Sequence, residues 1–195
     1  MTTWEFWGCS FLAFGPPFAM FVFTVAHDSV RIIIMILSCF FWLVALLLSG
    51  LLWFAVVPLR EELAFGLIFS VVFQEVSRGL LYLLLVKAEK GLENIGSGPP
   101  LLSSEQRHIL AYVCGFGFGV MSGLFALVNV LRDMTGPGTV GLFGDSNYFF
   151  LVSTFLSLCF VLLHTAWGVI FFDGLFMKKY WQPSLVIVAH LISSS

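Results

Sequence analysis

The stretch Gly115-Phe116-Gly117-Phe118-Gly119-Val120-Met121-Ser122-Gly123 decides how this chain folds, because it repeats glycine at a regular interval inside a long apolar segment. Gly115, Gly119 and Gly123 recur every four residues, so an α-helix would align them along one stripe. In water these glycines would weaken a helix, whereas in a bilayer the helix persists because it satisfies its own backbone polar groups. We predict that the stripe is a face against which another helix packs closely. The alternative is that membrane helices simply tolerate more glycine.

The composition is that of an integral membrane protein. Of 195 residues, 59% are hydrophobic and only 10% are charged, whereas a soluble domain carries about 25% charged residues. The net charge of −2 argues against nucleic-acid binding, which needs a clustered basic face. The cysteines lie in apolar runs without the spacing of a zinc site, so we expect buried thiols. They are Cys9, Cys39, Cys114 and Cys159.

The apolar segments predict an all-α, polytopic transmembrane helix bundle that forms a single domain over residues 1–195. A spanning helix needs about 20 mostly apolar residues. Five segments are long enough and a sixth stops after about a dozen residues, so we expect the chain to be cut off within its sixth helix. The predicted spans are 4–26, 32–57, 65–86, 109–131, 148–172 and the partial 183–195, and the longest loop is 87–108. Gly15-Pro16-Pro17 should kink or break the first span.

The basic residues predict the orientation of the bundle. Basic loop residues collect on the cytoplasmic side of a membrane. An extracytosolic N-terminus would place six of them inside, namely Arg31, Lys87, Lys90, Arg107, Lys178 and Lys179, and only Arg60 and Arg132 outside. We therefore predict that the N-terminus lies outside.

The glycine-rich run 136–145 should be an irregular loop, and it lacks the lysine of a phosphate-binding loop.

The third predicted span carries two opposite charges near its middle. Glu75 and Arg78 are three residues apart, so they share a helix face and can pair. A lone charge there would cost about 2.5–3.5 kcal/mol, so neither should face lipid. Two interpretations remain open: a polar site facing the bundle interior or a water-filled cavity, and a structural ion pair that locks helix packing.

Two histidines are predicted to lie at one depth. His164 is nine residues before Asp173, and His190 is seven residues after Pro183. The loop between their spans is short, so the helices should be antiparallel neighbours and both imidazoles can point into the bundle. A proton relay, a metal pair, a polar seam for a partner, or two hydrogen-bonded buried histidines would each fit, although two histidines alone are a weak metal signal.

The motifs of intramembrane proteases are missing. The aspartates lie at span ends or in loops, so no carboxylate pair can share a proton within two spans. The chain also lacks His-Glu-x-x-His. A serine mechanism would have to use Ser122 with His164 or His190, but the glycine expected two residues before the serine is absent. We therefore predict no catalytic residue, no metal ligand and no cofactor.

In its motifs the chain resembles the Aph (anterior-pharynx-defective) subunit of gamma-secretase along nearly its whole length. The resemblance includes the glycine stripe and Gln74-Glu75-Val76 with Arg78. Further matches are Phe14-Gly15-Pro16, Phe40-Phe41-Trp42-Leu43-Val44, Gly136-Pro137-Gly138-Thr139-Val140-Gly141, Leu162-Leu163-His164 with Trp167-Gly168, Phe171-Phe172-Asp173-Gly174 and His190-Leu191. The chain departs from the family pattern at Phe143 and Asn147, and after Arg78.

This resemblance implies a seven-span, non-catalytic scaffold that assembles with nicastrin, presenilin and the presenilin-enhancer subunit in the lipid bilayer. Presenilin would supply the catalytic aspartates that cleave type I membrane proteins such as Notch and the amyloid precursor. The resemblance assigns Gly115, Gly119 and Gly123 to assembly, and His164 and His190 to stable assembly and presenilin contact. It also implies residence in endoplasmic reticulum, Golgi, plasma and endosomal membranes.

A second hypothesis from a different class is a small-solute or proton channel or transporter. It would use the intramembrane polar residues Glu75, Arg78, His164 and His190. A transporter of this kind is expected to show an internal repeat with polar residues in matched spans. We find no such repeat in the sequence.

Overall fold

The computed structural model describes residues 3–56, 63–95, 106–135 and 148–194. This described part of the chain consists of α-helices without strands, which confirms the predicted all-α fold. The α-helices are α1 (Thr3–Met20), α2 (Ser29–Ala55), α3 (Leu63–Ile95), α4 (Arg107–Thr135), α5 (Phe149–Phe176) and α6 (Trp181–Ser194), and the π-helical turn η1 (Phe21–Val25) follows α1. The predicted loop over residues 136–145 lies outside the described residues.

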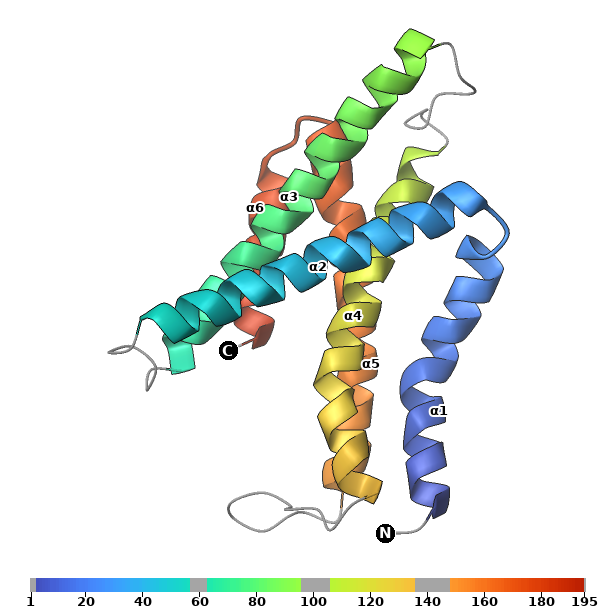
Figure 1. The fold of residues 1–195 in the computed structure, drawn as a ribbon, viewed down its shortest axis with the longest axis vertical. Coiled ribbons are helices and arrows are strands. Elements are labelled where there is room, and N and C mark those ends of the chain that lie inside the picture. Colours follow the sequence, from blue (N-terminus) through green and yellow to red (C-terminus); the bar gives the residue numbers. More distant parts are fainter. Residues whose placement is uncertain (1–2, 57–62, 96–105, 136–147, 195) are drawn as a thin grey trace.

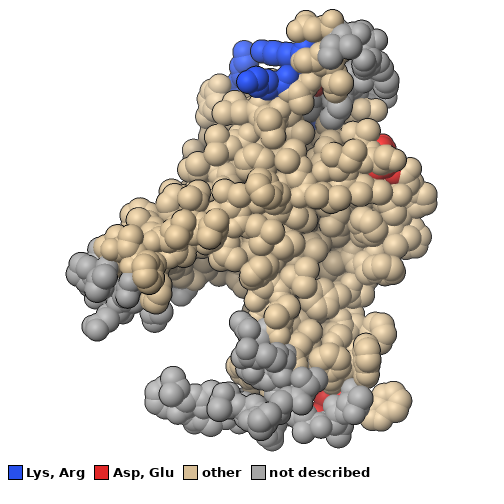
Figure 2. Space-filling view, in the orientation of Figure 1, with Lys and Arg blue, Asp and Glu red and all other residues tan. Residues whose placement is uncertain are grey.

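Five of these helices are long and apolar enough to cross a membrane. The spans are Trp4–Val25, Ser29–Ala55, Phe65–Leu92, Arg107–Val128 and Phe149–Phe176. Figure 2 shows a surface that is almost free of charge across its middle, with Lys and Arg gathered near one end. Such a surface suits hydrocarbon, because lipid tails offer charged groups no partner.

Of the kink or break predicted at Gly15-Pro16-Pro17, the break does not occur. Helix α1 continues through both prolines, and the departure from α-helical geometry comes later, in η1. A proline removes its own N–H donor and crowds the carbonyl of residue i−4, and a membrane helix tolerates this when neighbouring groups satisfy the freed backbone.

The predicted loop over residues 87–108 is also too long, because α3 continues to Ile95. The sequence of this extension, Lys87-Ala88-Glu89-Lys90-Gly91-Leu92, is polar but consists mostly of strong helix formers. Polarity ends the membrane-spanning part of a helix and does not end the helix. Part of the predicted loop, residues 96–105, lies outside the described residues.

Helix α4 lies at the centre of the bundle. It runs alongside α5 over most of its length, and α2 crosses it on another side (Figure 1). Helix α3 packs against α2 and α6, and α6 in turn packs against α5. The main core gathers where α4 meets these helices, with Leu81, Phe116, Phe118 and Phe172 fully buried. This arrangement brings α3, α5 and α6 to one common region beside α4.

Candidate functional site

A cluster of four buried ionisable side chains joins α3, α5 and α6. Glu75 and Arg78 come from one turn of α3, and Arg78 Nη1 lies 2.8 and 2.9 Å from the two carboxylate oxygens of Glu75. The two side chains are 4% and 1% exposed. The three-residue spacing along α3 therefore places a complete ion pair inside the bundle, facing away from lipid.

Each member of this ion pair also bonds to a histidine from another helix. Arg78 Nη2 lies 3.1 Å from Nδ1 of His164 on α5. Nδ1 of His190 on α6 lies 2.8 Å from Oε1 of Glu75. The two imidazole rings meet edge to face with 4.9 Å between their centroids. The structure thus unites all four intramembrane polar residues that the sequence singles out.

The partners fix the hydrogen-bonding role of Nδ1 on each ring. An arginine can only donate hydrogen bonds, so His164 Nδ1 is the acceptor and its ring is neutral, with its proton on Nε2. The Glu75 carboxylate can only accept, so His190 Nδ1 carries a proton and donates it. The charges of Glu75 and Arg78 cancel each other within their ion pair. An ion pair without net charge is less costly to bury in a bilayer than either charge alone.

Aromatic rings enclose the cluster. The Arg78 guanidinium lies 5.1 Å from the centroid of Phe118 on α4 and 5.7 Å from that of Phe171 on α5, within cation–π range. Trp167 of α5 lies 4.6 Å from the His190 ring and 5.1 Å from the His164 ring. The sequence interpretation did not assign Phe118, Phe171 or Trp167 to the site. Trp167 and Phe171 follow His164 by three and seven residues, and this helical spacing was the available signal. Phe118 gave no such signal.

The described residues hold no group of three His, Cys, Asp or Glu side chains arranged as a metal site. Both Nδ1 atoms of the histidine pair are already engaged by α3. Ser122 is half-buried on α4, and no hydrogen bond joins it to His164 or His190 within the described part of the chain. The contacts of the cluster are those of a helix-joining network.

The glycine stripe lies at the contact between α4 and α5, and its first position, Gly115, approaches the backbone of His164 in the cluster. A Cβ atom at Gly115 would lie 2.6 Å from the Thr165 carbonyl oxygen and 2.9 Å from the Gly168 Cα. A Cβ at Gly119 would collide with the Val161 carbonyl oxygen, and one at Gly123 would lie 2.5 Å from Val161 Cγ2. All three glycines therefore face α5 of the same chain.

Helix α4 has a second close-packed face that the four-residue spacing does not reveal. Gly117 lies between the stripe positions and faces α2, where its Cβ would be 2.8 Å from Ser38 Cβ. Ser38 Oγ donates a hydrogen bond of 2.5 Å to the Cys114 carbonyl. Gly117, the one glycine between the stripe positions, was the signal for this face. At the α4–α5 contact, Gly168 of α5 lies directly against Gly115 of α4. Two other small residues of α5, Ser157 and Thr165, also lie along this contact.

Known proteins similar to this chain come from animals and plants. A sequence model of the Aph-1 protein family matches residues 4–195. The gamma-secretase subunit Aph-1 of Drosophila melanogaster is 52% identical over 194 residues, with 100% of this chain and 80% of that protein covered. The human gamma-secretase subunit APH-1B is 46% identical over 204 residues, with coverages of 100% and 78%. The gamma-secretase subunit APH1-like of Arabidopsis thaliana is 31% identical, with coverages of 94% and 76%. With five helices able to span a bilayer and this similarity along its length, the chain is a multi-pass membrane protein that belongs to the Aph-1 family.

Proposed function

We propose that this chain is a non-catalytic scaffold and assembly subunit of gamma-secretase. In this role it supports the cleavage of type I membrane proteins, such as Notch and the amyloid precursor, by presenilin. The names of its relatives and an identity of 46–52% to the fly and human subunits support membership of this complex. None of the relatives given above is named for transport, and nothing supports the channel hypothesis.

The observation that carries the scaffold proposal is the mutual engagement of Glu75, Arg78, His164 and His190. All four are at most 4% exposed, and each bonds to another member of the cluster. Groups that react with a substrate need access to it, whereas groups that hold helices together need access only to each other. The cluster therefore favours a structural role, in which three helices are fixed into the surface that partners recognise.

The proposed partners are nicastrin, presenilin and the presenilin-enhancer subunit. Because Gly115, Gly119 and Gly123 face α5, we propose that they act on assembly indirectly, by allowing α4 and α5 to pack. His164 and His190 would act on presenilin contact in the same way, by setting the position of α6. The proposed location is the membranes from the endoplasmic reticulum to endosomes, with a lumenal N-terminus.

The proposal is tested in cells that lack their own Aph-1 subunits and express this chain with an affinity tag. We expect mild-detergent purification to recover nicastrin and presenilin, and cleavage of a Notch-derived reporter to return. Replacing the presenilin catalytic aspartates should abolish cleavage with this chain still present. If this chain recovered no nicastrin while a full-length family member did, the scaffold role would be refuted. Cleavage without the presenilin aspartates would refute the non-catalytic role.

Glycosylation tags at each end of the chain test the orientation. An unmodified N-terminal tag would contradict the proposed lumenal N-terminus.

A further inference from the structure

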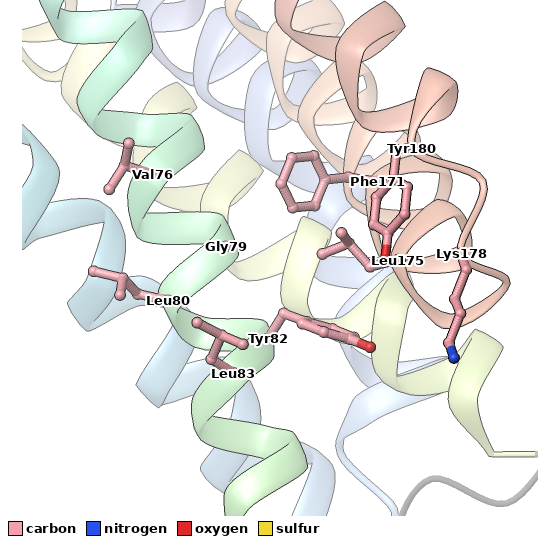
Figure 3. A pocket seen from close by; sticks show the side chains of 9 residues that line it. All are labelled: Val76, Gly79, Leu80, Tyr82, Leu83, Phe171, Leu175, Lys178 and Tyr180. Atoms are coloured by element: carbon pink, nitrogen blue, oxygen red, sulfur yellow. The ribbon is translucent and has the colours of Figure 1, made fainter.

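A pocket of about 520 Å³ opens between α3 and the turn that joins α5 to α6. Figure 3 shows Val76, Leu80 and Leu83 along one side, on α3, while Lys178 and Tyr180 extend from the α5–α6 turn on the other side. The remaining lining residues are Gly79, Tyr82, Phe171 and Leu175. The pocket thus has a long apolar wall and a polar end. It is separate from the glycine stripe and does not include the residues of the buried charged cluster.

The apolar wall of the pocket continues into a basic stripe. Val76, Leu80, Leu83, Lys87 and Lys90 follow one another at intervals of four and three residues, so they share one face of α3. All five are exposed. From Val76 to Lys87 the helix rises by about 16 Å, which is half the thickness of a bilayer core of about 30 Å. This face of α3 therefore has the length and polarity of a single lipid leaflet.

The end of the pocket lies at the level of the lipid head groups. Tyr180 and Trp181 are 66% and 63% exposed, as expected for aromatic residues at a membrane–water boundary. Lys178 and Lys179 are exposed beside them, and Figure 2 shows Lys and Arg side chains gathered at this end of the molecule. Among the described residues, no carboxylate forms an ion pair with Lys178. The pocket therefore presents an uncompensated cation where a lipid phosphate would lie.

The backbone at Lys178 gives an independent reason to single out this residue. Its φ is 56°, the positive φ of a left-handed residue. The Lys178 amide donates to the Leu175 carbonyl at 3.2 Å, and the Lys179 amide donates to the Gly174 carbonyl at 2.8 Å. This hydrogen-bond pattern ends a helix with a left-handed residue, for which glycine is the usual choice. A lysine held in this conformation at the edge of a pocket points to a use for its side chain.

We propose that this pocket binds one anionic phospholipid. An acyl chain would lie along Val76, Leu80 and Leu83, and the phosphate would lie at the Lys178 ammonium group beside the Tyr180 hydroxyl. Lys87 and Lys90, one to two turns further along α3, would add long-range attraction for the negative head group. Apolar contact and charge are both required, so a free phosphate or a zwitterionic lipid would bind more weakly.

The test measures lipid binding to the purified chain by native mass spectrometry, with phosphatidylserine and phosphatidylcholine of the same acyl chains. We expect one phosphatidylserine to bind preferentially. Lys178→Gln should weaken its affinity by about three- to tenfold, as expected for the loss of one cation near a head group. Lys178→Gly should do the same while keeping the left-handed backbone conformation. The matched control Lys179→Gln removes the same charge from the same turn outside the pocket, so it should weaken the affinity less than Lys178→Gln does.

A second pair of variants tests the apolar wall. A Cβ at Gly79 would meet nothing within 4 Å, so Gly79→Trp can fill the pocket without disturbing the helix, and it should reduce retention of both lipids. Gly50→Trp is the matched control, because Gly50 also has open space at its Cβ but lies on α2.

Four results would overturn the proposal. The affinity for phosphatidylserine could fall equally in Lys178→Gln and Lys179→Gln, or Gly79→Trp and Gly50→Trp could retain lipid equally. The chain could bind phosphatidylserine no better than phosphatidylcholine, or glycerophosphoserine, which has no acyl chains, could displace the bound lipid. A fifth result would assign the pocket to a protein instead. This result is a Leu83→Cys variant that cross-links to another subunit in the assembled complex while no lipid is retained.

Discussion

Adding one methyl group at Gly115 should disturb both the α4–α5 contact and the charged cluster. An alanine Cβ there would lie 2.6 Å from the Thr165 carbonyl oxygen, 2.9 Å from the Gly168 Cα and 3.0 Å from the His164 carbonyl oxygen. Ordinary contacts begin at 3.4 Å, so α5 would have to move away by about 0.8 Å. All three atoms belong to backbone, and no side-chain rotation can relieve the clash.

The cost of Gly115→Ala follows from two effects that act in the same direction. Overpacking a close-packed helix contact costs about 1–3 kcal/mol. The displaced backbone carries His164, whose bond to Arg78 is already 3.1 Å long, and loss of a hydrogen bond to a charged group costs about 1.5–3 kcal/mol. Alanine recovers up to about 1 kcal/mol through its higher helix propensity. We expect a net loss of about 2–5 kcal/mol in the free energy of unfolding.

The assay is reversible unfolding in mixed micelles with increasing SDS, followed by circular dichroism. Gly50→Ala is the control, since its new methyl group meets nothing within 4 Å and its stability should stay within about 1 kcal/mol of the original. If Gly115→Ala unfolded at the same SDS fraction as Gly50→Ala, the close approach of α4 and α5 would not be needed for stability.

Three further changes test the cluster and the stripe. Arg78→Met should cost about 3–5 kcal/mol, because it leaves the Glu75 carboxylate buried without its cation. Adding Glu75→Gln should restore part of this loss in a double-mutant cycle, and additive losses would contradict the pairing. His190→Ala should lower the free energy of unfolding by about 1–3 kcal/mol. His190→Asn should lower it less, because the asparagine amide can donate a hydrogen bond to the Glu75 carboxylate. Equal stability of the two variants would argue against the bond between His190 and Glu75. Gly119→Leu should lower recovery of nicastrin and presenilin in step with the loss of folded chain, and normal recovery would refute its role in assembly.

The helices could be predicted from the sequence because a bilayer allows few alternatives. Long apolar runs must form helices in hydrocarbon, since no other open-ended structure satisfies the backbone. The spacing of Glu75 and Arg78 also predicted that they could pair, because residues three apart share a helix face. The ends of helices were less predictable. Helix α3 continues to Ile95 because helix-forming polar residues extend it beyond the membrane.

The partners of each helix could not be predicted from spacing alone. The bond between Arg78 and His164 joins residues 86 positions apart, and that between Glu75 and His190 joins residues 115 apart. Local periodicity contains no information about such pairs, because it describes one helix at a time. For the same reason, the glycine spacing predicted a packing face but did not identify α5 as the helix that packs there. It also did not indicate that Gly117 faces α2.

His164 explains why this bundle needs both close packing and buried charge. In lipid, apolar side chains gain little by meeting each other, so close approach and polar contacts must select one arrangement of helices. The His164 backbone lies against Gly115, and its ring bonds to Arg78. A slip of α5 by one residue would rotate its side chains by about 100°, turning the ring away and leaving a buried guanidinium short of a partner. We infer that the glycines permit the contact between α4 and α5, and that the charged cluster selects its register.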